Sequence, residues 1–168
     1  MQNAKDTFYT MLQSRLAAVN PSRTIVVRGT VRPGLLVEEN ELPSAPPPTD
    51  CFRLCWTKLQ LVSTSPLPLV AMECSIAYAT AGSAGNAAMD RGRMLAAMDG
   101  ELFAALSVEP RSAPKLNYSG AGVGVAPTAL STSVFWADPV FGPVIVNEER
   151  LERTATVQVY AYREAGEL

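Results

Sequence analysis

The chain has 168 residues, close to the length of one ordinary domain, and 48% of them are hydrophobic while 18% are charged. It contains no histidine, which excludes histidine-based catalytic triads and the common zinc-ligand sets. The formal net charge of −2 and the scattered basic residues argue against sequence-specific nucleic-acid binding, which normally requires a basic stripe.

The first third predicts one helix and short strands. Apolar residues recur every three or four positions over residues 4–19, which indicates an amphipathic helix, and Asn20-Pro21 ends it. Residues 23–29 are rich in β-branched side chains and predict a strand, and residues 35–37 predict a brief second one. An acidic link follows, and then a stiff proline-rich connection over residues 43–48.

The middle of the chain predicts two long strands and a second helix. Residues 52–62 form the first strand, with a bulge or bend near Thr57-Lys58 where the apolar alternation changes phase. Residues 69–80 alternate without a break, which predicts a strand with one buried face, antiparallel to the first. Residues 86–107 carry a leucine and methionine stripe typical of a core-facing helix.

The last third is less regular. Residues 109–132 are rich in Pro, Gly, Ser and Ala and predict a long loop, and residues 133–146 predict a β-hairpin. Residues 153–164 alternate again and predict a final strand. We therefore expect a single α+β domain over 1–168, with a mixed, mostly antiparallel sheet of about four strands and two helices on one face. Residues 109–148 would form an inserted glycine-rich arm or hairpin.

The glycine run "YSGAGVGVAP", residues 118–127, does not fit a phosphate-binding loop. Gly120, Gly122 and Gly124 lack the spacing of a dinucleotide loop, whose third glycine position is occupied here by Val125. No helix pattern follows the run, so there is no helix N-terminus to bind phosphate. We expect no catalytic, cofactor-binding or metal-binding residues, no cofactor, and three reduced, mostly buried cysteines. No signal peptide or membrane span is evident.

The segment "RGTVRPGLLVEENELP", residues 28–43, and the closing strand "VQVYAYRE" resemble the tail terminator family of long-tailed bacteriophages, the gpU-like minor tail proteins. The order of helices and strands is also similar. The resemblance implies a structural virion protein rather than an enzyme. Such a protein is part of the virion tail or neck and is assembled in the host cytoplasm. It forms a hexameric ring at the head-proximal end of the tail tube, stops tube growth and joins the tail to the neck or connector proteins.

Polar and flexible residues near the predicted strand edges are the candidates for contacts between subunits or with the tube protein, since opposite charges set register at an interface. They are Arg23, Arg28, Arg32, Glu38, Glu39, Glu41, Gly120, Gly122 and Gly124. Three alternatives remain. The charges can be solvated surface groups, the protein can be another head–tail joining or neck protein, or it can be a small-molecule-binding enzyme of unrecognised type.

Overall fold

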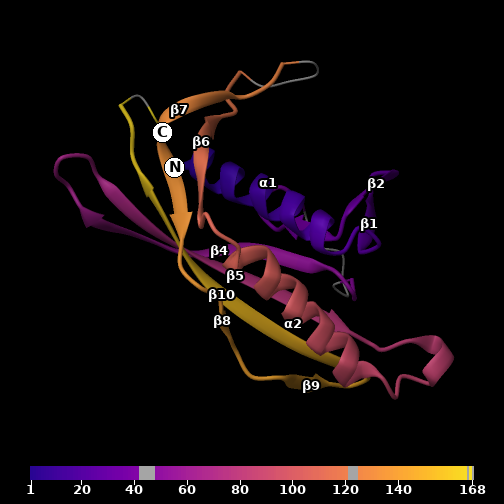
Figure 1. Cartoon of the computed structure of the whole chain (residues 1–168). Coiled ribbons are helices and arrows are strands. Elements are labelled where there is room, and N and C mark those ends of the chain that lie inside the picture. Colours follow the sequence, from indigo (N-terminus) through magenta and orange to yellow (C-terminus); the bar gives the residue numbers. More distant parts are fainter. Residues whose placement is uncertain (42–47, 121–124, 166, 168) are drawn as a thin grey trace.

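The computed structural model describes residues 1–41, 48–120, 125–165 and 167 (Figure 1). It contains two α-helices, one short 3₁₀ helix and ten strands among these residues. In chain order they are α1 (Gln2–Val19), β1 (Thr24–Val27), β2 (Thr30–Pro33), β3 (Leu35–Val37), β4 (Phe52–Ser63), β5 (Leu69–Thr80), η1 (Ala84–Asn86), α2 (Arg91–Ser107), β6 (Ser112–Asn117), β7 (Thr128–Trp136), β8 (Val140–Phe141), β9 (Ile145–Asn147) and β10 (Arg150–Tyr162).

Eight of these strands form one curled, mostly antiparallel sheet. Its order is β3-β4-β5-β10-β7-β6, and β8 and β9 also pair with β10. Only the short β3–β4 pair is parallel. The α+β class with a mixed, mostly antiparallel sheet is therefore confirmed, whereas the expectation of about four strands is wrong.

The longest ladder joins β5 to β10 at the centre of the sheet. It runs from Leu151 opposite Thr80 to Tyr162 opposite Leu69 without a register shift. Every second residue of β5 is buried, as the alternation predicts. The expected irregularity in β4 is also confirmed, because its register with β5 shifts between Trp56 and Lys58.

Both helices contribute to one core on the buried face of the sheet (Figure 1). Phe8 of α1 is fully buried and makes edge-to-face contacts with Trp56 of β4 and Trp136 of β7, with ring centroids 5.8 and 5.7 Å apart. From α2, Met98 and Leu102 are fully buried in the same core. The opposite face of the central strands is only half-buried.

Residues 109–148 do not form the predicted loop followed by a hairpin. β6 pairs with β7 and β7 pairs with β10, so most of this segment belongs to the sheet. The reason is burial at one end of β7, where Val134 and Trp136 enter the core. Two side chains of α1 also accept hydrogen bonds from this segment. Thr7 Oγ1 accepts from the N–H of Leu116 in β6, and Asn3 Oδ1 accepts from the N–H of Tyr118, the residue after β6.

The strand predicted over residues 23–29 is instead half of a separate hairpin, β1–β2. Its turn residues, Arg28 and Gly29, both have positive φ angles of 49° and 80°. Two consecutive residues of this kind form the turn type that suits the twist of a two-residue hairpin. The sequence pattern does not predict this turn, because a non-glycine residue such as Arg28 rarely adopts a positive φ angle.

Replacing Phe8 with alanine should destabilise the fold by about 3–5 kcal/mol, because it leaves a cavity between two tryptophans. Urea unfolding followed by circular dichroism measures this loss. Phe103→Ala is the matched control, since that ring is 55% exposed on α2 and its loss should change stability by about 0.5 kcal/mol or less. Equal losses for the two variants would contradict the described core.

Candidate functional site

Arg23, one of the predicted contact residues, bonds to α2 inside the molecule. Its Nε lies 2.5 Å from Glu101 Oε2, and its Nη2 donates to Oε1 at 2.9 Å. Its Nη1 donates to the carbonyl oxygen of Asp50, and Asn20 donates to Glu101 Oε1. Burial opposes ionisation of Glu101, but the hydrogen bonds from Arg23 and Asn20 outweigh it and lower the pKa of this carboxyl. Arg23 therefore ties the start of the β1–β2 hairpin to α2.

The other charged candidates, except Arg28, are also paired within the chain. The pairs are Arg32 with Glu41, Glu38 with Arg53 at 3.5 Å, and Glu39 with Lys5 at 2.7 Å. The second carboxylate oxygen of Glu41 accepts a hydrogen bond from the N–H of Val37 at 3.0 Å. These contacts tie β2 to the residues after β3, and they tie those residues to α1 and β4.

The remaining candidates lie at turns or outside the described residues. Arg28 is exposed at the tip of the β1–β2 hairpin and makes no ion pair with the described part of the chain. Gly120 is exposed just after β6, and a Cβ atom at this position would meet nothing within 4 Å. Gly122 and Gly124 lie outside the described residues. The structure therefore does not bring the nine candidates together into one site.

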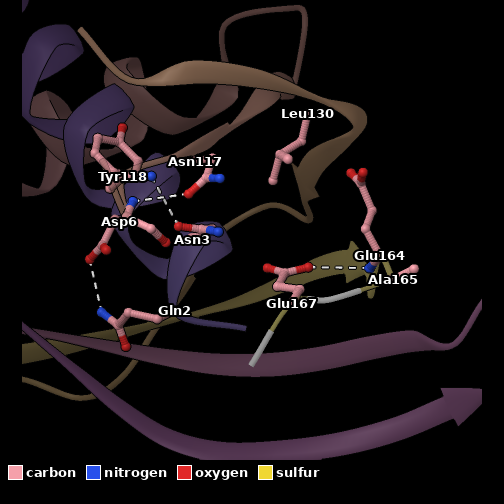
Figure 2. Close-up of a pocket in the computed structure, with 10 residues that line it drawn as sticks. Gln2, Asn3, Asp6, Asn117, Tyr118, Leu130, Glu164, Ala165 and Glu167 are labelled. Atoms are coloured by element: carbon pink, nitrogen blue, oxygen red, sulfur yellow. Dashed lines mark hydrogen bonds between the residues drawn. The ribbon is translucent and has the colours of Figure 1, made fainter. Parts of the chain in front are cut away.

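A hollow of about 380 Å³ lies between the start of α1, the end of β6 and the residues after β10 (Figure 2). Its lining is polar, but much of that polarity is already used. Gln2 donates to Asp6 at 2.9 Å, and Asn3 accepts from the N–H of Tyr118 at 3.1 Å. Burial raises the pKa of Asp6. A ligand here would have to compete with hydrogen bonds that the chain makes with itself.

Next to this hollow, Lys115 of β6 is fully buried. Its Nζ donates to the carbonyl oxygen of Tyr162 at 2.6 Å and to Glu167 Oε2 at 2.7 Å, and Glu164 Oε1 lies 3.5 Å away. A buried ammonium group needs such partners because removing a charge from water is costly. The cluster ties β6 to the residues that follow β10.

Glu164 also binds two consecutive residues of β7. It accepts from the hydroxyl of Thr132 at 2.6 Å and from that of Ser131 at 2.8 Å, as well as from both backbone N–H groups. These hydrogen bonds, those from Thr132 foremost, lower the pKa of Glu164 to about 2. Like Lys115, Glu164 therefore ties the end of β10 to the neighbouring strands.

A third polar cluster joins α2 to the central strands. Tyr78 Oη donates to Asp99 Oδ1 at 2.5 Å, and Arg153 donates to Asp99 Oδ2. Burial, assisted by the hydrogen bond to Asp99, raises the pKa of Tyr78, so the phenol keeps its proton at neutral pH. Asp99 and Glu101 bind different partners, as expected for residues two apart on a helix.

The three cysteines are free thiols, and two of them, Cys51 and Cys74, are buried. Burial raises the pKa of Cys51 to about 11 and also raises that of Cys74, which disfavours the reactive thiolate.

Within the described residues, no group of three or more His, Cys, Asp or Glu side chains could hold a metal ion. Neither described helix combines the length and the hydropathy needed to cross a membrane.

Large apolar side chains are exposed along two strand edges. The first, here called the β4 edge, is residues 58–63, where Leu59, Leu61 and Val62 are 58%, 52% and 53% exposed. The second, the β9 edge, is residues 144–147, where Ile145 and Val146 are 53% and 75% exposed. Among the described strands, β3 pairs with β4 only over Phe52–Leu54, and β9 pairs only with β10. Both edges therefore have an unpaired side.

The sequence pattern predicts neither edge. The alternation of Leu59 and Leu61 indicates a strand, but it does not reveal that this part of β4 extends beyond the helices that would cover it. Ile145 follows two prolines, Pro139 and Pro143, and lies within the predicted arm or hairpin of residues 109–148. One sequence feature is common to both edges, a short apolar run beside a charged residue. Lys58 precedes the run of the β4 edge, and Glu148 follows the run of the β9 edge.

Replacing Arg23 with methionine should destabilise the fold by about 2 kcal/mol, because the charge-assisted hydrogen bonds to Glu101 are lost. Chemical denaturation measures the change. Arg28→Met is the control and should alter stability by about 0.5 kcal/mol or less, since Arg28 is exposed and makes no ion pair with the described residues. An unchanged stability for Arg23→Met would show that this pair contributes nothing to the fold.

Replacing Glu164 with glutamine should lower stability at neutral pH by about 1 kcal/mol and flatten its dependence on acid. The folded-state pKa of about 2 lies below the ordinary value of 4.5, so the wild-type contribution is complete above that value. It is lost as the pH falls from about 4.5 to about 2. Denaturation at a series of pH values tests this, with the exposed Glu149→Gln as control. Parallel pH profiles for wild type and Glu164→Gln would contradict the assignment.

The charged candidates thus serve mainly internal contacts, while the exposed apolar residues gather at the β4 and β9 edges. Comparison with models of known protein families gives no match for this chain, and comparison with curated proteins gives none. The surfaces themselves are therefore the basis for inferring what the protein does.

Proposed function

We propose that this chain is a structural protein of a bacteriophage tail, a tail terminator that forms a ring at the head-proximal end of the tail tube. The observation that carries the proposal is the exposure of large apolar side chains along two unpaired strand edges. A chain that already has a complete core does not need these side chains for folding, and exposed apolar patches mark sites of protein association.

The organisation of the chain also supports the proposal. An opening helix, a long strand pair, a second helix and a closing aromatic strand follow one another in the order on which the resemblance to tail terminators rests. In such a role, function is carried by surfaces. One surface would join neighbouring copies in a hexameric ring, and others would contact the tube protein and the neck or connector proteins.

Disrupting the gene for this chain in the phage or prophage that encodes it should give tails of irregular and excessive length that carry no heads. The physical reason is that nothing would cap the growing tube. Electron microscopy of lysates measures tail length and head attachment, and a wild-type copy supplied in trans should restore both.

Tails of normal length attached to heads would contradict the proposal. Tails of normal length without heads would also contradict it, because they would indicate a neck protein that acts after tube growth has stopped.

A further inference from the structure

We propose that the β4 edge of one copy pairs with the β9 edge of the next copy, so that the sheet continues from chain to chain. This inference rests on the proposed function for the ring, and it names the two surfaces that would form it. The partner is a second copy of this chain, because both halves of the contact are present in one chain and lie at different edges of one sheet.

The topology places these edges on opposite sides of the two central strands. β4 flanks β5, and β9 flanks β10. Figure 1 shows the β4–β5 hairpin and β9 projecting in different directions from the body of the molecule. Surfaces that differ and point apart form head-to-tail contacts, which generate rings or filaments rather than two-fold dimers.

Strand direction is also consistent with such pairing. β4, β5, β10 and β9 are successive neighbours, and each neighbouring pair is antiparallel. β9 therefore runs opposite to β4. When copies repeat in one orientation along a shared sheet, β9 of one copy meets β4 of the next as an antiparallel pair, which is the more stable ladder.

Charge supports the same arrangement. In an antiparallel pair, the end of β9 lies beside the start of the β4 edge. The end of β9 leads into the acidic turn Glu148-Glu149, and the β4 edge begins at Lys58. None of these three side chains makes an ion pair with the described residues, so they are available to pair with one another between copies. A parallel arrangement would place the acidic turn at the other end, beside Ser63.

Other strand edges are less suited to this contact. β6 is bonded along its outer side by Thr7, and the N–H that follows it is bonded by Asn3. β3 has three residues and is followed directly by the ion-paired acidic link. The β4 and β9 edges combine unpaired backbone, exposed apolar side chains and complementary charge.

The two edges are offset along the strands. Val146 lies opposite Leu151 of β10, whereas Gln60 aligns through Ala71 with Tyr160 near the other end of β10. Each added copy is therefore displaced along the strand direction. Such a displacement closes into a ring when the strands tilt relative to the ring axis, as strands do in β-barrels.

Crosslinking of two cysteine variants tests the pairing in the full chain. Gln60→Cys and Asn147→Cys would each be made in a Cys55→Ser background, because Cys55 is the one natural thiol that is not buried. Pairing of Glu149 with Lys58 places residues 60 and 147 opposite each other, and both lie on the outer face of the sheet. A short thiol-reactive crosslinker should join the two variants when they are mixed and should join neither variant to itself.

Val26→Cys mixed with Gln60→Cys is the matched control, since Val26 is 65% exposed but lies on β1. Crosslinking of Gln60→Cys to itself would overturn the inference in favour of a two-fold β4–β4 contact. An oligomer that gives no mixed crosslink, or a chain that stays monomeric by light scattering, would also overturn it.

Charge reversal gives a second test. Restoration of association by a second substitution distinguishes a lost interface from a misfolded chain. Lys58→Glu should weaken self-association roughly tenfold, because it places like charges together across the junction. The double variant Lys58→Glu with Glu149→Lys should restore association. Failure of the double variant to do so would contradict the predicted orientation.

These outcomes are distinguishable from those of the proposed function. A mutant phage with overlong tails, combined with an oligomer that gives no mixed crosslink, would retain the tail terminator and reject this interface. Mixed crosslinking in a chain whose loss leaves tails normal would retain the interface and reject the tail terminator.

Discussion

The antiparallel ladder between β5 and β10 is the constraint on which the rest of the structure depends. Its unbroken register fixes which residues of both strands face the helices, because a shift by one residue would turn every side chain to the other face. The buried face of this pair is part of the hydrophobic core and includes Cys74, Ile76, Val157 and Val159. Every other strand of the main sheet joins one side of this pair, directly or through a neighbour.

The polar clusters connect the surrounding elements to this pair. Asp99 joins α2 to Tyr78 and Arg153, and Lys115 joins β6 to the residues after β10. Glu101 joins α2 to Arg23 at the start of the small hairpin. Charges that are bound in this way fix the arrangement of elements. The large apolar side chains on strands that reach beyond the helices are not used in this way and remain exposed.

The sequence predicts best where burial follows a local period. The alternation of Val70, Met72 and Cys74 identified β5, and the phase change before Lys58 located the bulge in β4. Both helices were also expected close to where they lie. Each of these patterns is produced by a segment whose own side chains report which face is buried.

The sequence predicts poorly where the reason for structure lies far away in the chain. Residues 128–133 are mostly exposed and carry no apolar alternation. They form a strand because β6 pairs with them, whereas β10 pairs with β7 only over residues 134–136. The ion pair of Arg23 with Glu101 likewise spans most of the first hundred residues, and no local pattern predicts it. The exposure of Leu59 depends on where α1 and α2 stop covering the sheet, which is also a tertiary property.

The central position of β10 has a consequence for how the protein is made. β10 is synthesised after every other described strand of the sheet, so β5 keeps one open side while the residues between Thr80 and Arg150 are translated. At ordinary rates of translation this interval is on the order of ten seconds. During that time the edge of β5 that later receives β10 lacks its native partner strand. The sheet can be completed only after translation has passed residue 162, so its central ladder is the last one to form.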